Sequence, residues 1–349
     1  MYTFNEVSSH GHEQVMFCND SVSGLRVIIA LHNTKHGRAM GATRLFPYVS
    51  EAEALKDALR LSRGMTYKAA CAKIPVGGGK AVIIGDPGIK NRDLLHAYGR
   101  VIEKLGGQFV TGQDINLSID DVRTIAEKTQ YVVGVSGQGG GPVTSTAKGV
   151  LLGILAAVKF KLKRSSLDGV RVAVQGVGGV GKELCMLLHT HGALLTLSDI
   201  DPERAKSVAA ITGAQVVQPE EIFSCTADVF APCSLGFILN DSTIPQLKAS
   251  IIAGCANNQL ADEHHHSRLL MERDILYCPD YVINAGGLIN VYNEMIGYDE
   301  QKENFALLGI PQTLQEIFEI AESDGITTNE IANRIAEEQI HRYSCLSPN

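Results

Sequence analysis

Apolar and polar positions in the first third of the chain alternate between strand-like and helix-like patterns. Residues 25–31 and 39–46 are short apolar runs of strand length, and leucines recur at helical spacing after residue 50. Ser50 and Glu53 have the spacing of a capping box, which predicts that a helix begins there. This pattern predicts an α/β unit. It continues with a strand at 81–84, a helix over 91–105, a strand at 109–111 and a helix that starts near Ser118.

The alternation becomes more regular from residue 170 onward. Apolar runs of strand length recur there, separated by segments long enough for helices, and this pattern favours a doubly wound parallel sheet. The expected strands cover 170–174, 194–197, 227–230, 250–253 and 275–277, and a helix is expected over 180–191.

A glycine-rich segment separates the two halves. Residues 136–142 read Ser-Gly-Gln-Gly-Gly-Gly-Pro, which is unsuited to regular structure and predicts a hinge. An amphipathic pattern over 328–340 predicts a helix that packs back on the first domain. We therefore expect a two-domain α/β fold, in which residues 1–135 and 326–349 form one domain and residues 136–325 form the other.

Composition excludes several classes of protein. The 349 residues are 45% hydrophobic and 20% charged, which is the balance of a globular chain. With 31 Lys and Arg against 38 Asp and Glu, the net charge is −7, so a cationic surface for nucleic acid or anionic lipid is not expected. The basic run at 159–164 fits the C-terminal end of a helix, where cations complement the helix dipole.

The cysteines and the apolar stretches indicate the cellular compartment of the protein. The eight cysteines form no Cys-x-x-Cys pair, which argues against a disulfide framework or a zinc ribbon and favours a reducing cytoplasm. Residues 1–14 lack the apolar core of a secretory signal. The longest apolar stretch, 150–158, is well short of the ~20 residues that span a bilayer. We expect a soluble protein with no membrane partner.

Three consecutive histidines, His264 to His266, follow Asp262 and Glu263. Consecutive side chains on a helix cannot all face one ion, so a solvated turn is favoured over a metal site. No metal is therefore expected in this protein.

The strongest local motif is a strand that runs into Gly-x-Gly-x-x-Gly at Gly176, Gly178 and Gly181. Such glycines allow a tight turn and close approach of the backbone to a pyrophosphate, which binds at the N-terminus of the following helix, here at Gly179 and Val180. This predicts a dinucleotide-binding domain.

An acidic residue follows the next expected strand. Asp199 is suitably spaced to accept both ribose hydroxyls of NAD and to repel the 2′-phosphate of NADP. Asp201 is close enough to take that role instead. The motif therefore predicts NAD as the cofactor.

Small residues and amides follow the later strands of the second domain. Ligands of doubly wound sheets bind at the carboxyl ends of the strands, so these residues are expected to admit a nicotinamide ring and hydrogen-bond its carboxamide. We take residues 281–283 as the last of these strands. The candidates are Ala231, Pro232 and Cys233, then Ala256 and Asn257, and finally Asn284.

The first domain contains two lysines and a carboxylate in glycine-rich surroundings. Lys80 follows Gly77 to Gly79, but Ile74 and Ala81 exclude a Walker A loop. Together with Lys68 and Asp114, Lys80 suggests a site for an anionic carbonyl substrate, with one cation for a carboxylate, one for the carbonyl, and an acid/base group. Solvated surface lysines are an equally good interpretation of the spacing alone.

Five motifs, in order along the chain, resemble those of the leucine, phenylalanine and valine dehydrogenases, which are related to glutamate dehydrogenase. They are Gly-Met-Thr-Tyr-Lys at 64–68, Gly-Gly-Gly-Lys at 77–80, Thr-Gly-Gln-Asp at 111–114, Ala-Asn-Asn-Gln-Leu at 256–260, and Pro-Asp-Tyr-Val-Ile-Asn-Ala-Gly-Gly at 279–287.

The resemblance implies oxidative deamination of an L-amino acid by NAD to a 2-oxo acid and ammonia. It implies that Lys68 binds the substrate carboxylate, that Lys80 activates the water that attacks the imine, and that Asp114 exchanges protons with the amine. The first domain would bind substrate and mediate oligomerisation, the second would be a Rossmann-type NAD-binding domain, and the active site would lie in the cleft between them. Thr146 and Asn257 would help to seat the cofactor, and Gly41, Met65 and Asn257 would border the substrate.

Two departures from the leucine-type pattern bear on the substrate. Ala42 replaces a glycine, and Gly112 replaces an alanine before the acid, as in the phenylalanine branch. With Met40 and Leu288 as expected pocket walls, the missing methyl at Gly112 favours an aromatic side chain. The chain most resembles the tryptophan dehydrogenase branch, which implies conversion of L-tryptophan to indole-3-pyruvate, ammonia and NADH by a homo-oligomer, with a dimer favoured.

Other functions stay open at this point. A leucine-, valine- or phenylalanine-preferring enzyme of the same family is one alternative, and a non-catalytic NAD-binding regulator is another, since fold does not fix function. A 2-hydroxy-acid dehydrogenase is disfavoured because no convincing His base and Arg clamp are found in the sequence.

Overall fold

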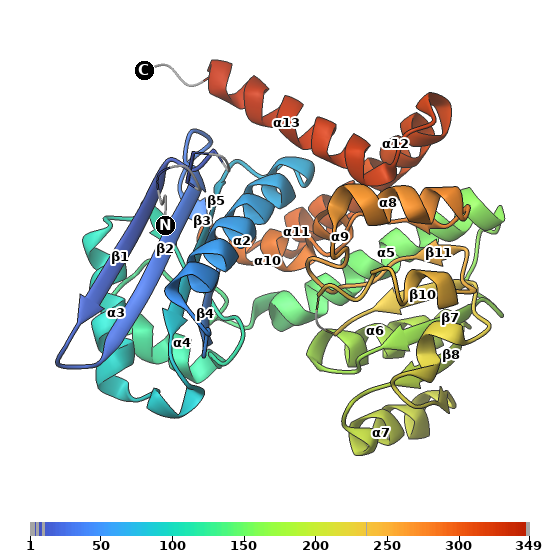
Figure 1. Cartoon of the computed structure of the whole chain (residues 1–349), viewed down its shortest axis with the longest axis horizontal. Helices are drawn as coiled ribbons and strands as arrows, with labels where there is room; N and C mark the ends of the chain where they lie inside the picture. The colour runs from blue at the N-terminus through green and yellow to red at the C-terminus, as the bar shows by residue number, and fades with distance from the viewer. Residues whose placement is uncertain (1–3, 5–6, 9–10, 235, 347–349) are drawn as a thin grey trace. The chain divides into compact units, whose positions relative to one another are not determined.

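Internal contacts divide the chain into two units (Figure 1). Unit 1 comprises residues 1–138, 294–298 and 336–349, and unit 2 comprises residues 139–293 and 299–335. The computed structural model describes residues 4, 7–8, 11–234 and 236–346. The first crossing between the units falls within the glycine-rich segment that predicts the hinge.

Unit 1 is built on a mixed sheet. Its strands follow the order β1-β2-β5-β3-β6, with β4 also paired to β5. The pairs β1–β2 and β2–β5 are antiparallel, whereas β3, β4 and β6 run parallel to their neighbours. The strands are β1 (Gln14–Asp20), β2 (Leu25–Asn33), β3 (Ala39–Met40), β4 (Thr43–Phe46), β5 (Gly77–Ile84) and β6 (Phe109–Val110).

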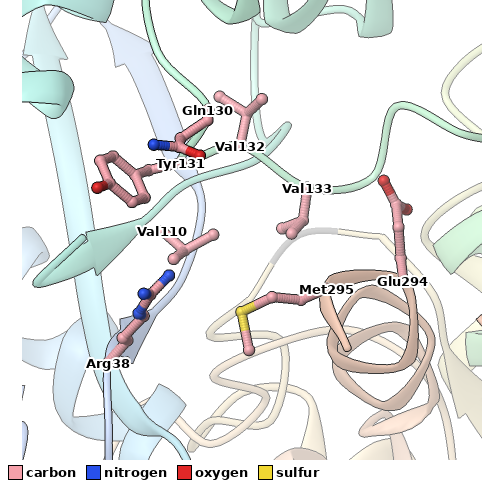
Figure 2. A pocket seen from close by; sticks show the side chains of 8 residues that line it. All are labelled: Arg38, Val110, Gln130, Tyr131, Val132, Val133, Glu294 and Met295. Atoms are coloured by element: carbon pink, nitrogen blue, oxygen red, sulfur yellow. The ribbon is translucent and has the colours of Figure 1, made fainter. Parts of the chain in front are cut away.

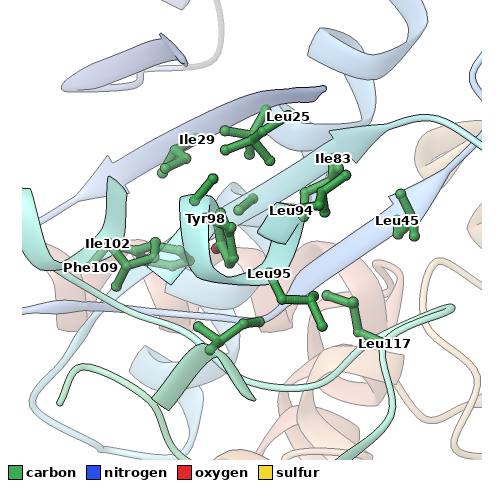
Figure 3. Packing of buried hydrophobic residues seen from close by; sticks show 14 of the residues in the cluster. Leu25, Ile29, Leu45, Ile83, Leu94, Leu95, Tyr98, Ile102, Phe109 and Leu117 are labelled. Carbon is green, nitrogen blue, oxygen red and sulfur yellow. The ribbon is translucent and has the colours of Figure 1, made fainter. Parts of the chain in front are cut away.

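Helices cover both faces of this sheet. On one face, Leu55 and Leu59 of the long helix α2 pack on β2 and β5. On the other face, Tyr98 and Phe109 are fully buried in an apolar cluster that joins the sheet to α3 (Figure 3). Both faces of β2 and β5 are therefore buried, which explains their continuous apolar sequences. The helices are α2 (Glu51–Cys71), η1 (Pro87–Ile89), α3 (Arg92–Lys104) and α4 (Ile119–Ala126).

Unit 2 is built on a parallel sheet with the strand order β12-β11-β10-β7-β8-β9. Strand β7, which leads into the Gly-x-Gly-x-x-Gly motif, lies in the middle of the sheet. Strands β8 and β9 follow on one side of β7 and strands β10 to β12 on the other, which is the strand order of a Rossmann fold. The predicted doubly wound sheet is thereby confirmed. Its strands are β7 (Arg171–Gln175), β8 (Leu194–Ser198), β9 (Gln215–Val216), β10 (Val229–Pro232), β11 (Ile251–Ile252) and β12 (Leu276–Tyr277).

The helices of the second half begin with the turn η2 (Gln138–Gly140) and α5. The others are α6 (Gly179–Thr190), α7 (Pro202–Thr212), η3 (Glu221–Ser224), η4 (Ile244–Gln246), α8 (Glu263–Glu272), α9 (Asp280–Ile283), α10 (Gly286–Met295), α11 (Glu300–Leu307), α12 (Gly309–Asp324) and α13 (Thr328–Leu346). The last part of α13 belongs to unit 1, where Tyr67 donates a hydrogen bond to Glu337 at 2.9 Å.

Helix α5 (Gly141–Leu162) is the one described helix that, with the turn before it, is long and apolar enough to cross a membrane. Length and composition alone give this result, and 56% of its most apolar window is buried inside the protein. The helix packs against α6 and α12 of unit 2. These contacts account for its apolar sequence as that of a core helix.

Two expected strands differ in the structure. The run at 39–46 is split into β3 and β4 at Gly41, where a Cβ would lie only 1.8 Å from the carbonyl oxygen of Gly79. Residues 281–283 are not a strand but lie in helix α9, which follows Pro279. Asn284 therefore follows a helical turn, and the strand that precedes it is β12.

Candidate active site

In unit 1, glycines at the start of β5 set the position of Lys80. A Cβ on Gly78 would lie 2.2 Å from the backbone nitrogen of Thr66 in α2, and one on Gly79 would lie 2.7 Å from the ring of Phe109. These glycines therefore let α2 and the ring of Phe109 pack closely on β5, a role distinct from phosphate binding. They leave Lys80 as a buried cation, with its side chain 7% exposed.

Lys80 forms an ion pair with Asp114, which follows β6. The β4–β5 register puts Arg44 on the same face of the sheet as Lys80, and Arg44 Nε lies 3.2 Å from Asp114 Oδ2. Arg44 also contacts Asp57 of α2 at 3.0 Å, and Tyr48 donates a hydrogen bond to Asp57. Sequence reasoning missed Arg44, although it lies two residues after Ala42, one of the departures from the leucine-type pattern.

The two cations determine the protonation state of Asp114. Burial alone would raise the Asp114 pKa, but the charges of Lys80 and Arg44 outweigh burial and hold the pKa at about 2. Asp114 is therefore ionised near neutral pH and is in the form that can accept a proton.

Lys68 lies in the last turn of α2, on the face of the sheet that carries Lys80. The close approach of Gly78 to Thr66 fixes this part of α2 on β5. Lys68 is half-buried, as is Met65 one turn earlier. Unit 1 thus has two lysines and a carboxylate on one side of its sheet.

The predicted walls of the side-chain pocket in unit 1 lie on this same face. Met40 pairs with Gly78 of β5 and with Val110 of β6, so the alternation of side chains puts Met40 and Val110 on the face of Lys80. Gly112 lies two residues beyond Val110. A Cβ on Gly112 would point toward Val133, 3.1 Å from its carbonyl oxygen.

Val133 is also a wall of a cavity of about 310 Å³ in unit 1 (Figure 2). Val110, Val133 and Met295 give the cavity an apolar part, and Figure 2 shows Met295 and Val133 on the same side of it. Arg38 lies over the ring of Tyr131 at the other side, 5.6 Å from the ring centre. The cavity therefore adjoins Val133, the residue toward which a Cβ on Gly112 would point.

In unit 2, the glycine motif forms the predicted tight turn between β7 and α6. Gly176 has φ +91°, and a Cβ on Gly181 would lie 2.1 Å from the Gly176 carbonyl oxygen. Gly178 is the N-cap of α6, and Gly179 and Val180 form its first turn. The free amide groups of this turn suit a pyrophosphate.

The structure separates the roles of the two candidate acids. Asp199 directly follows β8, and its side chain accepts hydrogen bonds from the backbone of Val177 in the glycine turn, at 2.8 Å, and of Asp201, at 2.9 Å. Asp201 is the N-cap of α7, where it accepts from the backbone nitrogens of Glu203 and Arg204. Asp199 is thus tied to the glycine turn, and Asp201 is occupied as a helix cap.

The ends of β10 and β11 border this turn. Ala231 and Pro232 pair with β7, and the Cys233 backbone nitrogen donates to the Gln175 carbonyl oxygen at 2.7 Å. The backbone nitrogen of Ala256 donates to Pro232 at 2.9 Å. The glycine turn and these strand ends therefore lie side by side.

Asn284 offers an unused acceptor at the same edge. Its Nδ2 donates to Asn257 Oδ1 at 2.9 Å and to the Cys255 carbonyl oxygen at 3.1 Å. Its Oδ1 is buried and has no hydrogen-bond partner within the part of the chain that the structure describes. A buried acceptor of this kind fits an amide donor such as the carboxamide of a nicotinamide.

The two remaining candidates of unit 2 are Thr146 and Leu288. Thr146 lies in α5, and a Cβ on Gly287 would lie 2.7 Å from its hydroxyl oxygen. Leu288 is buried in α10, one residue later. Thr146 and Leu288 therefore both lie where the first turn of α10 packs closely against the start of α5.

The histidine cluster lies in the first turn of helix α8 rather than in a turn between elements. Nε2 of His265 and of His266 lie 2.8 and 3.4 Å from Asp241 Oδ1, close enough to suggest a metal site. The Asp262 backbone nitrogen, however, donates to His266 Nδ1 at 2.8 Å, so the neutral ring carries its proton on Nε2. His266 therefore lacks a lone pair directed at a metal.

Comparison with known proteins shows the family of the chain. The family model for the Glu/Leu/Phe/Val dehydrogenase dimerisation domain matches residues 12–135, and the Glutamate/Leucine/Phenylalanine/Valine dehydrogenase model matches residues 194–305. An L-tryptophan dehydrogenase of Nostoc punctiforme is 59% identical over 98% of this chain and 97% of its own. A leucine dehydrogenase of Geobacillus stearothermophilus is 47% identical over 97% and 94%.

A solved structure extends the likeness to the fold. The crystal structure of L-tryptophan dehydrogenase from Nostoc punctiforme matches with a TM-score of 0.84 and 56% identity, covering 97% of this chain and 99% of the other. The family models, the relatives and the fold agree, and the chain is therefore an amino acid dehydrogenase of the Glu/Leu/Phe/Val dehydrogenase family.

Proposed function

We propose that the protein catalyses the NAD-dependent oxidative deamination of an aromatic L-amino acid, converting L-tryptophan reversibly to indole-3-pyruvate, ammonia and NADH. The observation that carries the proposal is the buried Lys80–Asp114 pair on the sheet face that α2 covers with Lys68. The 59% identity to a protein named L-tryptophan dehydrogenase supports the choice of substrate.

Each polar residue of the candidate site in unit 1 has a role in the proposed reaction. Lys68 binds the substrate carboxylate, and Asp114, which is ionised, accepts a proton from the substrate ammonium group. The NAD site proposed in unit 2 would supply the acceptor for the hydride that leaves Cα. Lys80 then orients a water molecule for attack on the resulting imino acid and stabilises the oxygen anion that forms. Arg44 is a positioning residue that holds Asp114 beside Lys80.

The cofactor site is proposed in unit 2. Gly176, Gly178 and Gly181 with the first turn of α6 would hold the pyrophosphate, Asp199 the ribose, and Asn284 the carboxamide. Asp199 is favoured over Asp201 because its carboxylate is joined to the glycine turn. A negative charge there favours NAD over NADP.

The alternative substrates are leucine, valine and phenylalanine. The 47% identity to a leucine dehydrogenase is the reason to include them in a substrate screen. We also propose that the protein acts in the cytoplasm as a homo-oligomer, with a dimer favoured, and that it has no nucleic acid or membrane partner. The match of unit 1 to a domain described as a dimerisation domain supports self-association.

A screen of the twenty L-amino acids with NAD and with NADP, followed at the absorbance of the reduced cofactor, tests the proposal. We expect the highest kcat/KM with L-tryptophan and NAD. A preference for leucine or valine would refute the aromatic assignment. No turnover with any amino acid would favour the non-catalytic NAD-binding regulator.

A further inference from the structure

Two thiols lie side by side at the end of the parallel sheet in unit 2. Strands β10 and β11 are paired at Phe230 and Ile252, and the loops that follow stay together through the hydrogen bond from Ala256 to Pro232. Cys233 and Cys255 are in these two loops, each three residues beyond the paired residues Phe230 and Ile252. Both side chains are half-buried.

The pair borders the glycine turn and Asn284. A Cβ on Gly181 would lie 3.2 Å from the Cβ of Cys233, and the Cys255 carbonyl oxygen accepts the 3.1 Å hydrogen bond from Asn284. The thiols therefore lie at the edge where we propose that the nicotinamide binds. Any movement of either loop would disturb that edge.

The environment of Cys233 differs from that of the other half-buried thiols. Burial raises the pKa of Cys18 and of Cys225, which keeps these two in the unreactive thiol form. The hydrogen bond from Cys255 instead lowers the pKa of Cys233, because it stabilises the thiolate. Thiolates are the nucleophiles in thiol oxidation.

We propose that Cys233 and Cys255 are a redox modification site, at which a peroxide forms a reversible disulfide that blocks cofactor binding. This inference rests on the proposed NAD site of unit 2. It assigns a regulatory role to two thiols that the deamination reaction does not use.

The chemistry is balanced with hydrogen peroxide as the oxidant. The Cys233 thiolate attacks one peroxide oxygen, the O–O bond breaks, and Cys233 sulfenic acid and hydroxide form. Cys255 then attacks the Cys233 sulfur, and the hydroxyl group leaves as water with the Cys255 proton. Two thiols lose two electrons and peroxide is reduced to two waters. A thiol reductant reverses the modification.

Disulfide formation would distort the cofactor edge. The two sulfurs must come together in a covalent bond of about 2.05 Å with a fixed dihedral angle. This draws the loop of Cys255 toward Cys233 and alters the contact between Cys255 and Asn284. We therefore expect weaker NAD binding in the oxidised protein.

The test treats the full-length protein with hydrogen peroxide, with and without NAD, and maps disulfides by mass spectrometry of peptides. Affinity for NAD is measured by calorimetry before oxidation, after oxidation and after dithiothreitol. Cys255→Ser removes the resolving thiol, and Cys225→Ser is the matched control because it removes a half-buried thiol remote from this pair. We expect a Cys233–Cys255 disulfide, protection by NAD, and NAD affinity that is at least about tenfold weaker until reduction.

Cys225→Ser should behave like the wild type, whereas Cys255→Ser should form no reversible disulfide. A disulfide mapped to Cys185 or another thiol, or unchanged NAD affinity in the protein with the Cys233–Cys255 bond, would overturn the inference. Failure of the proposed function has a different signature, because a reduced protein that binds no NAD would refute the NAD site before any oxidation.

Discussion

Lys80 shows how individual residues create the chemistry proposed here. Its ammonium group is buried and paired with a carboxylate that Arg44 also contacts, so removing Lys80 leaves Asp114 with one cation still beside it. The fold of unit 1 should therefore survive the loss of this lysine. The cofactor candidates belong to unit 2, so the dinucleotide site should be unaffected.

Lys80→Ala should lower kcat by on the order of 10²-fold or more, because the charge that stabilises the developing oxygen anion is lost. NAD affinity, measured by calorimetry, should stay close to that of the wild type. Near-normal turnover would mean that Lys80 has a structural role only.

Cofactor choice should depend on the charge of Asp199. The wild type should prefer NAD to NADP by at least tenfold in kcat/KM, or about 1.4 kcal/mol. Asp199→Asn should reduce this ratio, whereas Asp201→Asn is the matched control, because it removes a neighbouring charge, keeps a side-chain acceptor for the cap of α7 and should have little effect on the ratio. Equal use of both cofactors by the wild type would contradict the assignment.

Gly112 tests the side-chain pocket. Gly112→Leu should fill space toward Val133 and lower the ratio of kcat/KM for tryptophan to that for leucine by at least tenfold, since such misfit costs ~1–3 kcal/mol. Gly112→Ala is the control, because its methyl needs only a small shift of Val133. If both variants keep the wild-type ratio, residue 112 does not line the side-chain pocket, and Met40 and Leu288 are the next positions to vary.

Among the helices and strands, sequence reasoning predicted those that a local sequence pattern determines without help from tertiary contacts. The strand, glycine turn and helix at 171–190 follow from local rules, and so does the helix that Ser118 caps. Strand β1 was missed because its exposed edge position gives it a mixed pattern. The split between β3 and β4 depends on the approach of Gly79 to Gly41, a tertiary contact that the local sequence does not encode.

The residues at the start of the hinge, 134–136, are held by a side chain from a distant helix. Glu294, near the end of α10, accepts hydrogen bonds from the backbone nitrogens of Gly134, Val135 and Ser136 at 3.1, 3.3 and 3.4 Å. Three consecutive amides bind one carboxylate just before the chain leaves unit 1. No local motif near the hinge indicates this distant partner.

Glu294→Ala should free this segment. Hydrogen bonds to a charged group are worth ~1.5–3 kcal/mol each, so protection of these three amides from hydrogen exchange should fall by at least about tenfold. Glu294→Gln, which keeps one carbonyl acceptor, should have an intermediate effect. Unchanged exchange at 134–136 in the alanine variant would show that the carboxylate does not anchor the hinge.

At the scale of the whole molecule, the sequence predicts the α/β class, the Rossmann sheet and a crossing between the units near residues 136–142. Later crossings of the chain, near 293, 298 and 335, could not be predicted, because they depend on how α10 and α13 divide their contacts between the two units. The site residues Lys80, Asp114 and Asp199 follow from motifs. Arg44, by contrast, is defined only by its contacts with Asp114 and Asp57.

The proposed activity of this chain is the oxidative deamination of an aromatic amino acid with NAD. The most direct measurement is the stoichiometry of products from L-tryptophan and NAD, with 2-oxo acid, ammonia and NADH quantified in one reaction. We predict equal amounts of indole-3-pyruvate, ammonia and NADH. NADH formation without ammonia, or no NADH from tryptophan under conditions where leucine is oxidised, would contradict the claim.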